Sequence, residues 1–148
     1  RSYMPDAGIT TDIIVGFPGE TDEEFQETLE FVKDIGFSRI HVFKYSPRQG
    51  TPAANFANQI PADIKEERSR RLIELGHRME RAYLKGFLEK TETVLFEKMS
   101  SEKEGYCEGY TDHYIKVLAP GSEHLINSLL PVSLKCINDN YIEGSINA

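Results

Sequence analysis

A β-branched run that leads directly into a tight turn constrains the beginning of this chain more than any other feature. Residues 9–15, ITTDIIV, are interrupted only by Asp12 and predict a strand that is buried on both faces. Residues 16–19, GFPG, predict a sharp reversal, because glycine permits positive φ and proline restricts φ. Thr21 and Glu24 have the spacing of a capping box, so a helix should begin there. The segment therefore predicts a βα corner at the carboxyl end of a strand, where ligands bind in parallel α/β folds.

A second strand follows after one helix. An apolar stripe with helical spacing predicts a helix over residues 21–35, and Gly36 is a typical C-terminal stop. Residues 39–45, RIHVFKY, then predict a strand. A helical crossover between two strands gives parallel pairing. The strand ends at Gly16 and Tyr45 should therefore lie side by side.

A long loop and a long helix come next. Residues 46–60 are rich in Pro, Gly, Ala and Asn, and a connection of this length is more often functional than idle. Pro61 begins a helix whose apolar stripe extends to Phe87, with Glu–Arg pairs four residues apart on its other face. We interpret that charged face as solvated. The alternative is that six cations on it contact phosphates: Arg68, Arg70, Arg71, Arg78, Arg81 and Lys85.

After Lys90 the hydrophobic period changes from that of a helix to that of a strand, which predicts a second domain. Five short strands are expected at residues 93–99, 105–111, 114–118, 132–137 and 141–146, with a tight turn at residues 111–114. Five antiparallel strands of this length suggest a small OB-like barrel. The predicted domains are residues 1–90 and 91–148.

Composition is that of an ordinary globular protein. Of 148 residues, 39% are hydrophobic and 28% charged, and neither a membrane span nor a signal peptide is visible. We therefore expect a cytoplasmic protein with no membrane partner. The chain lacks an initiator Met and enters a strand almost at once, which suggests a piece of a longer protein.

Cys107 and Cys136 have no metal-binding spacing and are interpreted as reduced thiols, with a disulfide as the alternative.

The net charge of −7 is uneven along the chain. Residues 1–90 hold 13 basic and 15 acidic side chains, whereas residues 91–148 hold 4 basic and 9 acidic ones, a net charge of −5. This balance argues against strong nonspecific binding of nucleic acid by the isolated chain.

Two motifs resemble a known family. Residues 12–21, DIIVGFPGET, and 41–53, HVFKYSPRQGTPA, resemble the last two strand motifs of the radical-SAM methylthiotransferases, the MiaB-like enzymes. The strand-rich segment resembles their TRAM domain, a small RNA-binding barrel, and residues 109–117, GYTDHYIKV, are most similar to the MtaB-like branch. The resemblance implies an α/β fold: the C-terminal βα units of an incomplete, TIM-like radical-SAM barrel, followed by a small antiparallel OB-like β-barrel.

The resemblance also implies a function for the longer protein. Such an enzyme adds a methylthio group to carbon 2 of N6-threonylcarbamoyladenosine, or a related modified adenosine, next to the tRNA anticodon. Its cofactors are S-adenosylmethionine and two [4Fe–4S] clusters, and its partner is the tRNA anticodon arm. The CxxxCxxC motif and the three further cysteines of the family are absent here, so this chain alone should be inactive and bind no cofactor. The alternatives are the sister family that methylthiolates a ribosomal-protein aspartate, and a non-catalytic module that binds RNA or protein.

The implied cofactor contacts lie at the two strand ends, which should shape half of a nucleoside-sized cradle. Glycine lets a ligand approach closely, an aromatic ring offers an apolar face, and backbone groups of the second strand end would hold the adenine edge. These predicted contacts are Gly16, Phe17, Pro18, Phe43, Tyr45 and Ser46. Each could instead belong to an ordinary turn or strand end. Asp12, which alternation places on one face with Thr10 and Ile14, either contacts cofactor or substrate or makes a structural hydrogen bond.

The implied substrate contacts are a loop cation and three barrel residues. Arg48 suits a phosphate or carboxylate, including the threonylcarbamoyl carboxylate, and is otherwise an exposed arginine. Tyr110, Tyr114 and Lys116 could stack on bases or contact phosphate, or the tyrosines could be half-buried core residues. No catalytic residue or metal ligand is assigned, and His41, His77, His113 and His124 are interpreted as structural or surface residues.

The two predicted parallel strands lack the neighbours that a complete barrel would give them. Their open sheet edges predict self-association of the isolated chain.

Overall fold

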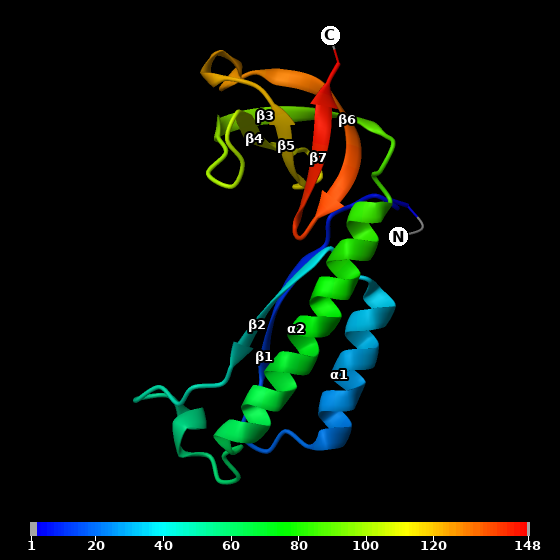
Figure 1. Ribbon diagram of the computed structural model, residues 1–148. Helices are drawn as coiled ribbons and strands as arrows, with labels where there is room; N and C mark the ends of the chain where they lie inside the picture. The colour runs from blue at the N-terminus through cyan, green and yellow to red at the C-terminus, as the bar shows by residue number, and fades with distance from the viewer. Residues whose placement is uncertain (1–2, 148) are drawn as a thin grey trace. The chain divides into compact units, whose positions relative to one another are not determined.

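A computed structural model describes residues 3–147 of the chain, which form two compact units (Figure 1). One unit comprises residues 9–80, and the other comprises residues 81–147 together with residues 3–8. The boundary predicted between residues 90 and 91 stays a prediction.

The first unit is a parallel βαβ arrangement followed by a long helix. Strand β1 (Thr10–Val15) pairs in parallel with β2 (Arg39–Lys44), so the predicted crossover is confirmed. Helices α1 (Asp22–Ile35) and α2 (Ala62–Lys85) lie side by side against this sheet (Figure 1). Their apolar sides enclose a core whose four fully buried members are Val15, Phe25, Val32 and Leu72.

Local sequence accounts for the bounds of α1. Thr21 is the N-cap residue, and both hydrogen bonds of the predicted capping box are present. Gly36 ends the helix in the left-handed region at φ 66°, and its N–H donates to the carbonyl of Val32. The predicted start and stop of this helix are confirmed.

Strand β1 is buried on one face only, so the prediction of burial on both faces is wrong. Thr10, Asp12 and Ile14 are exposed, and 56% of Ile14 is accessible. Val15 on the other face is fully buried against the helices. A β-branched run is compatible with either environment, because periodicity does not show what covers a sheet. Within the described residues the helices cover one face.

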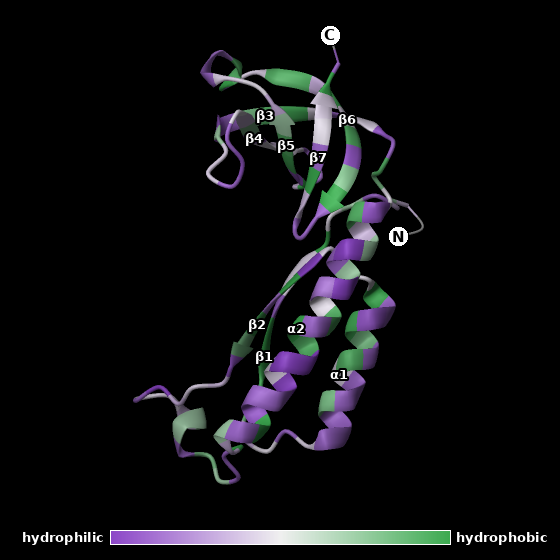
Figure 2. Ribbon diagram, in the orientation of Figure 1, coloured by the Kyte–Doolittle hydropathy of each residue, from purple (hydrophilic) through white to green (hydrophobic). Residues whose placement is uncertain are grey.

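The connection from β2 to α2 is a loop as predicted and contains one short element, whereas the end of α2 differs from expectation. Residues 46–60 are not wholly irregular, because Pro52–Asn55 form a short 3-10 helix, η1. Helix α2 ends at Lys85, so Phe87 lies beyond it and packs into the core of the second unit. Figure 2 shows that hydrophilic residues dominate the side of α2 in view.

The second unit is a closed five-stranded barrel, as predicted. Its strands are β3 (Thr91–Met99), β4 (Tyr106–Thr111), β5 (Lys116–Pro120), β6 (Leu129–Asn138) and β7 (Tyr141–Ile146), and η2 (Glu123–Leu125) lies in the connection before β6. The strand order is β3-β4-β5-β7-β6. The expectation of entirely antiparallel pairing is wrong at one place, because β5 and β7 pair in parallel and thereby help close the barrel. Closure leaves no free sheet edge in this unit.

Alternating strand residues fill the barrel interior. Fully buried members include Val94, Phe96, Val117, Leu134 and Ile142. Both cysteine thiols are free, with Cys107 buried and Cys136 exposed, in agreement with the expected reduced state.

Tyr114 belongs to a turn and not to the strand predicted for residues 114–118. Its φ is 58°, and its N–H donates to the carbonyl of Thr111. Strand β5 begins two residues later. The described helices include none that is both long enough and apolar enough to cross a membrane.

Candidate functional site

The two strand ends meet as predicted. The N–H of Tyr45 donates to the carbonyl of Val15 over 2.9 Å, and β1 and β2 run in parallel up to this point. Gly16 follows Val15 directly. Gly16 and Tyr45 therefore lie together at the carboxyl ends of neighbouring strands, the position at which α/β sheets bind ligands.

Three aromatic rings form a cluster at these strand ends. The Phe17 ring packs edge-on against Tyr45 at 5.2 Å between centroids, and against Phe56 at 6.2 Å. Phe17 and Phe56 are 44% and 48% exposed, so the cluster presents an apolar surface to solvent. The Tyr45 hydroxyl is buried and has no hydrogen-bond partner among the described residues. An apolar face beside an unpartnered hydroxyl suits a flat ring that carries polar edge atoms.

Phe56 was not identified from the sequence. It lies in the loop between β2 and α2, just after η1. The available signal was a lone aromatic residue in a segment otherwise rich in Pro, Gly, Ala and Asn. Only the folded loop brings its ring to Phe17.

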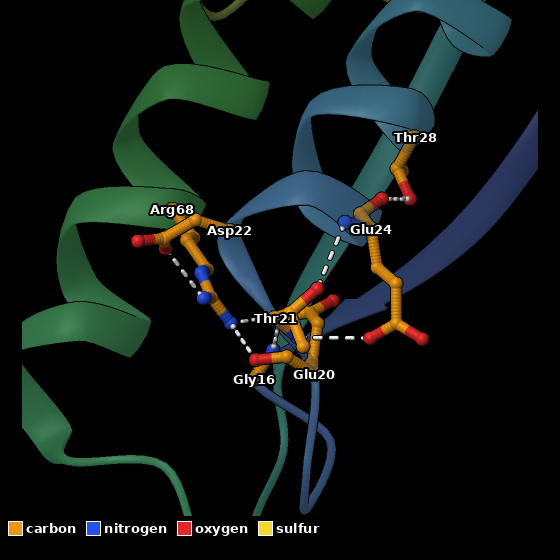
Figure 3. A network of polar contacts seen from close by, with 7 residues as sticks. All are labelled: Gly16, Glu20, Thr21, Asp22, Glu24, Thr28 and Arg68. Carbon is orange, nitrogen blue, oxygen red and sulfur yellow. Dashed lines mark hydrogen bonds and ion pairs between the residues drawn. The ribbon is translucent and has the colours of Figure 1, made fainter.

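The turn between β1 and α1 is held by a partly buried network of hydrogen bonds and ion pairs (Figure 3). The Gly16 N–H donates to Oε2 of Glu20 over 2.7 Å, and Nη1 of Arg68 donates to the same oxygen over 2.6 Å. Arg68 also donates to the Glu20 carbonyl and to Oδ1 of Asp22. Because its N–H is engaged in this way, Gly16 offers the turn as a rigid surface and not as a free amide donor.

Arg68 corrects the interpretation of the charged face of α2. It is 4% exposed, and so it is neither solvated nor available to a phosphate. Burial by itself lowers the pKa of Arg68, but hydrogen bonds with Asp22 and Glu20 raise it above the ordinary value. The Glu20 carboxylate therefore links the turn to α2.

Lys65 is a second residue of α2 at the strand ends. A Cβ atom on Gly16 would clash with Cγ of Lys65, so any larger residue would have to displace this side chain. Nζ of Lys65 donates to the Tyr45 carbonyl over 3.1 Å. Both backbone groups of Tyr45 thus have partners within the chain, and a cation lies beside the aromatic cluster. No sequence signal singled out Lys65 among the basic residues of the helix.

The remaining predicted cofactor residues surround this point. Register and exposure place Asp12, Ile14 and Phe43 on the open face of the sheet, with Ile14 opposite Phe43. Both interpretations of Asp12, a contact with cofactor or substrate and a structural hydrogen bond, stay predictions. Ser46 is exposed, and Pro18 is half-buried. Arg48 is exposed in the loop that follows β2.

A groove of about 740 Å³ lies beside the outer edge of β1. Ile13, Phe31 and Phe37 line it together with Phe17 and Pro18 from the turn. Within the described residues the sheet has two strands, so the outer edge of β1 has no strand partner. An unpaired edge beside an apolar groove is typical of a surface that another strand and helix cover.

The structure separates the three predicted RNA contacts in the barrel. Tyr114 is 83% exposed at the tip of the β4–β5 turn, where its ring is accessible. Tyr110 is half-buried on β4, opposite Lys116 on β5. The Lys116 ammonium lies between the carboxylates of Glu102 and Glu108, and its side chain is 13% exposed.

The two carboxylates beside Lys116 also shift its pKa. Burial by itself lowers the pKa of Lys116, but the Glu102 hydrogen bond and the Glu108 charge raise it above the ordinary value. Two carboxylates thus already balance the charge of this ammonium, which makes it a weaker site for a phosphate than an unpaired lysine.

These features define a class of protein: an α/β segment with a ligand-type site at its strand ends, followed in sequence by a small OB-like barrel. No family model matches the chain. The threonylcarbamoyladenosine tRNA methylthiotransferase MtaB of Bacillus subtilis (strain 168) is 40% identical over 146 residues, which cover 97% of this chain and 32% of that protein. The chain belongs to the family of MiaB-like and MtaB-like methylthiotransferases and corresponds to their C-terminal part.

Other relatives carry a different substrate name. The tRNA-2-methylthio-N(6)-dimethylallyladenosine synthases of Symbiobacterium thermophilum and Desulfitobacterium hafniense (strain Y51) are both 40% identical to this chain. The matches cover 31% and 33% of the length of those two proteins, and 99% and 100% of this chain. The chain thus spans about a third of the length of the curated relatives that it matches.

Proposed function

We propose that this chain is the part of a radical-SAM tRNA methylthiotransferase that forms one side of the nucleoside cradle and carries the RNA-binding barrel. The whole protein would add a methylthio group to a modified adenosine next to the tRNA anticodon. The observation that supports this most is the meeting of Phe17, Tyr45 and Phe56 at two adjacent strand ends. The relatives named above act, by their names, on such adenosines.

The residues at the strand ends fit the adenosyl group of S-adenosylmethionine. The Phe17 ring offers an apolar face, and the unpartnered Tyr45 hydroxyl can bond a polar atom of a nucleoside. In this family S-adenosylmethionine supplies the radical that abstracts hydrogen from the substrate. The aromatic residues of this chain would orient the nucleoside and keep water away from it. Lys65 would hold the end of β2 in place through the Tyr45 carbonyl.

The residues of this chain do not fit the iron–sulfur clusters. Cluster irons are held by sets of cysteine thiolates. The two cysteines here lie on β4 and β6 of the barrel, and Cys107 is fully buried. The cluster ligands would therefore come from the two thirds of the relatives that this chain does not span, and the chain alone should be inactive.

We propose N6-threonylcarbamoyladenosine as the substrate. It carries a carboxylate, whereas the dimethylallyl group of the alternative substrate is apolar. The exposed guanidinium of Arg48, in the loop after β2, could pair with that carboxylate through two hydrogen bonds. Sequence identity does not separate the two substrates, since relatives with either name are 40% identical.

Nucleoside mass spectrometry tests this proposal. Deleting the gene should abolish the methylthio derivative of N6-threonylcarbamoyladenosine in tRNA, and complementation should restore it. Arg48→Gln in the whole protein should reduce restoration, whereas Lys33→Gln, a change of an exposed cation on α1, should not. Loss of the methylthio derivative of the dimethylallyl nucleoside would support the second substrate.

The same strain decides between the alternatives. An unchanged tRNA with loss of the methylthio group from a ribosomal-protein aspartate would support the sister family. Unchanged tRNA and unchanged ribosomal proteins would support a binding module without chemistry.

A further inference from the structure

Outside the strand ends, one cluster of side chains has the composition of a metal site. Among residues 3–147, Glu92, Asp112 and His113 form the one group of three potential ligands whose ligand atoms all lie within 4.8 Å of one another. Glu92 belongs to β3, and the other two lie in the turn between β4 and β5. We propose that these three side chains bind a divalent transition-metal ion of the zinc type.

The barrel register accounts for this meeting. Val94 is paired with Thr111 in the antiparallel β3–β4 ladder. Strand β4 ends at Thr111, so the turn that follows it lies near the start of β3, which carries Glu92. Glu92 also shares the inward face of β3 with Val94 and Phe96, but it lies at the rim and is only half-buried. A carboxylate is thus directed toward the turn at the mouth of the barrel.

The turn that carries the other two ligands is rigid. The hydroxyl of Thr111, a residue that is 5% exposed, accepts hydrogen bonds from the N–H groups of His113 and Ile115. The His113 ring packs against Phe87 at 5.1 Å between centroids, and this packing limits its rotation. His113 is thus a preorganised ligand, which reduces the entropy lost on binding, whereas the Asp112 side chain is 82% exposed and lies 3.7 Å from Nδ1 of His113.

Charge also favours a bound cation at this point. Two carboxylates, those of Glu92 and Asp112, come within 4.8 Å of each other, and residues 91–148 carry a net charge of −5. Like charges at this separation repel, and a divalent ion between them removes the repulsion. Two carboxylate oxygens and one imidazole nitrogen suit zinc, manganese or cobalt, with the remaining positions open to water.

A metal in this place would connect the β4–β5 turn to β3. The turn carries Tyr114, which is 83% exposed and is a predicted base-stacking residue. Fixing the turn would fix the position of that ring. The ion would thus position a predicted RNA contact without taking part in the reaction, an effect that rests on the proposed RNA-binding function of the barrel.

Titration of the 148-residue chain with ZnCl₂ in a calorimeter tests the site. We expect one ion to bind per chain. Loss of a residue that only supports a metal ligand typically lowers the affinity for the metal by roughly 10- to 100-fold, and removing a ligand itself should lower it by at least as much. The informative variants are His113→Ala, Glu92→Gln and Asp112→Asn. The matched controls are His124→Ala, another barrel histidine, and Cys136→Ser, the exposed thiol.

CoCl₂ provides an independent readout, because visible absorption of bound Co²⁺ reports its coordination. Circular dichroism checks that each variant is folded, and the two conservative carboxylate variants keep the test valid should His113→Ala unfold. Weakening confined to the three ligand variants supports the site. Absence of binding, or equal weakening in His124→Ala or Cys136→Ser, overturns it.

Discussion

Replacing Arg68 by Met should destabilise the first unit by about 3 kcal/mol. The Arg68 bond to Glu20, which is largely buried, contributes about 1.5–3 kcal/mol as a charged hydrogen bond. The bond to the Glu20 carbonyl adds about 1 kcal/mol, and the bond to Asp22 adds little, because 90% of that side chain is exposed. Met keeps the aliphatic stem, so the loss is mainly that of the guanidinium.

Urea unfolding, followed by the circular dichroism of the helices, measures the change in the free energy of unfolding. Hydrogen exchange of the Gly16 amide reports the local loss of stability in the turn. That amide donates to Glu20 and should exchange faster once Arg68 no longer holds the carboxylate. Arg70→Met is the matched control, since Arg70 forms exposed pairs with Glu67 and Glu74 and should leave the midpoint unchanged. An Arg68→Met protein within about 0.5 kcal/mol of wild type, with unchanged Gly16 exchange, would refute the role given to this network.

Two further substitutions and two properties of the unchanged chain have expected outcomes. Gly16→Ala should lower the free energy of unfolding by at least about 1 kcal/mol in urea titrations, because φ is 72° and the new Cβ would meet Lys65. Tyr114→Ala should weaken binding of a tRNA anticodon stem-loop in fluorescence anisotropy by about 1–3 kcal/mol without changing the melting temperature. Burial raises the pKa of the Cys107 thiol, so at pH 8, where only a thiolate reacts, Ellman's reagent should label Cys136 alone until the chain unfolds. The isolated chain should self-associate in light scattering through the unpaired sheet edges and the groove beside β1, and a monomer at high concentration would contradict this.

Local sequence determined the elements whose signals lie within a few residues. Thr21 with Glu24 and the glycine at position 36 specified both ends of α1, because caps act through neighbouring backbone groups. The alternating apolar residues of the last part of the chain likewise predicted a five-stranded barrel, and β7 was predicted with its observed bounds. The meeting of Gly16 with Tyr45 also followed from sequence, since a short crossover leaves parallel pairing as the favoured solution.

Tertiary structure decided what depends on residues far apart in the chain. Arg68 looked like any other basic residue of a charged helix face, and only its partners 46 and 48 residues away made it buried. The helices pack against one face of β1 and leave the other open. The periodicity of the sequence does not encode where the helices pack. The proximity of Glu92 to His113 arose because β3 lies beside the end of β4. In each case a long-range contact, whose free energy exceeds local preference, set the outcome.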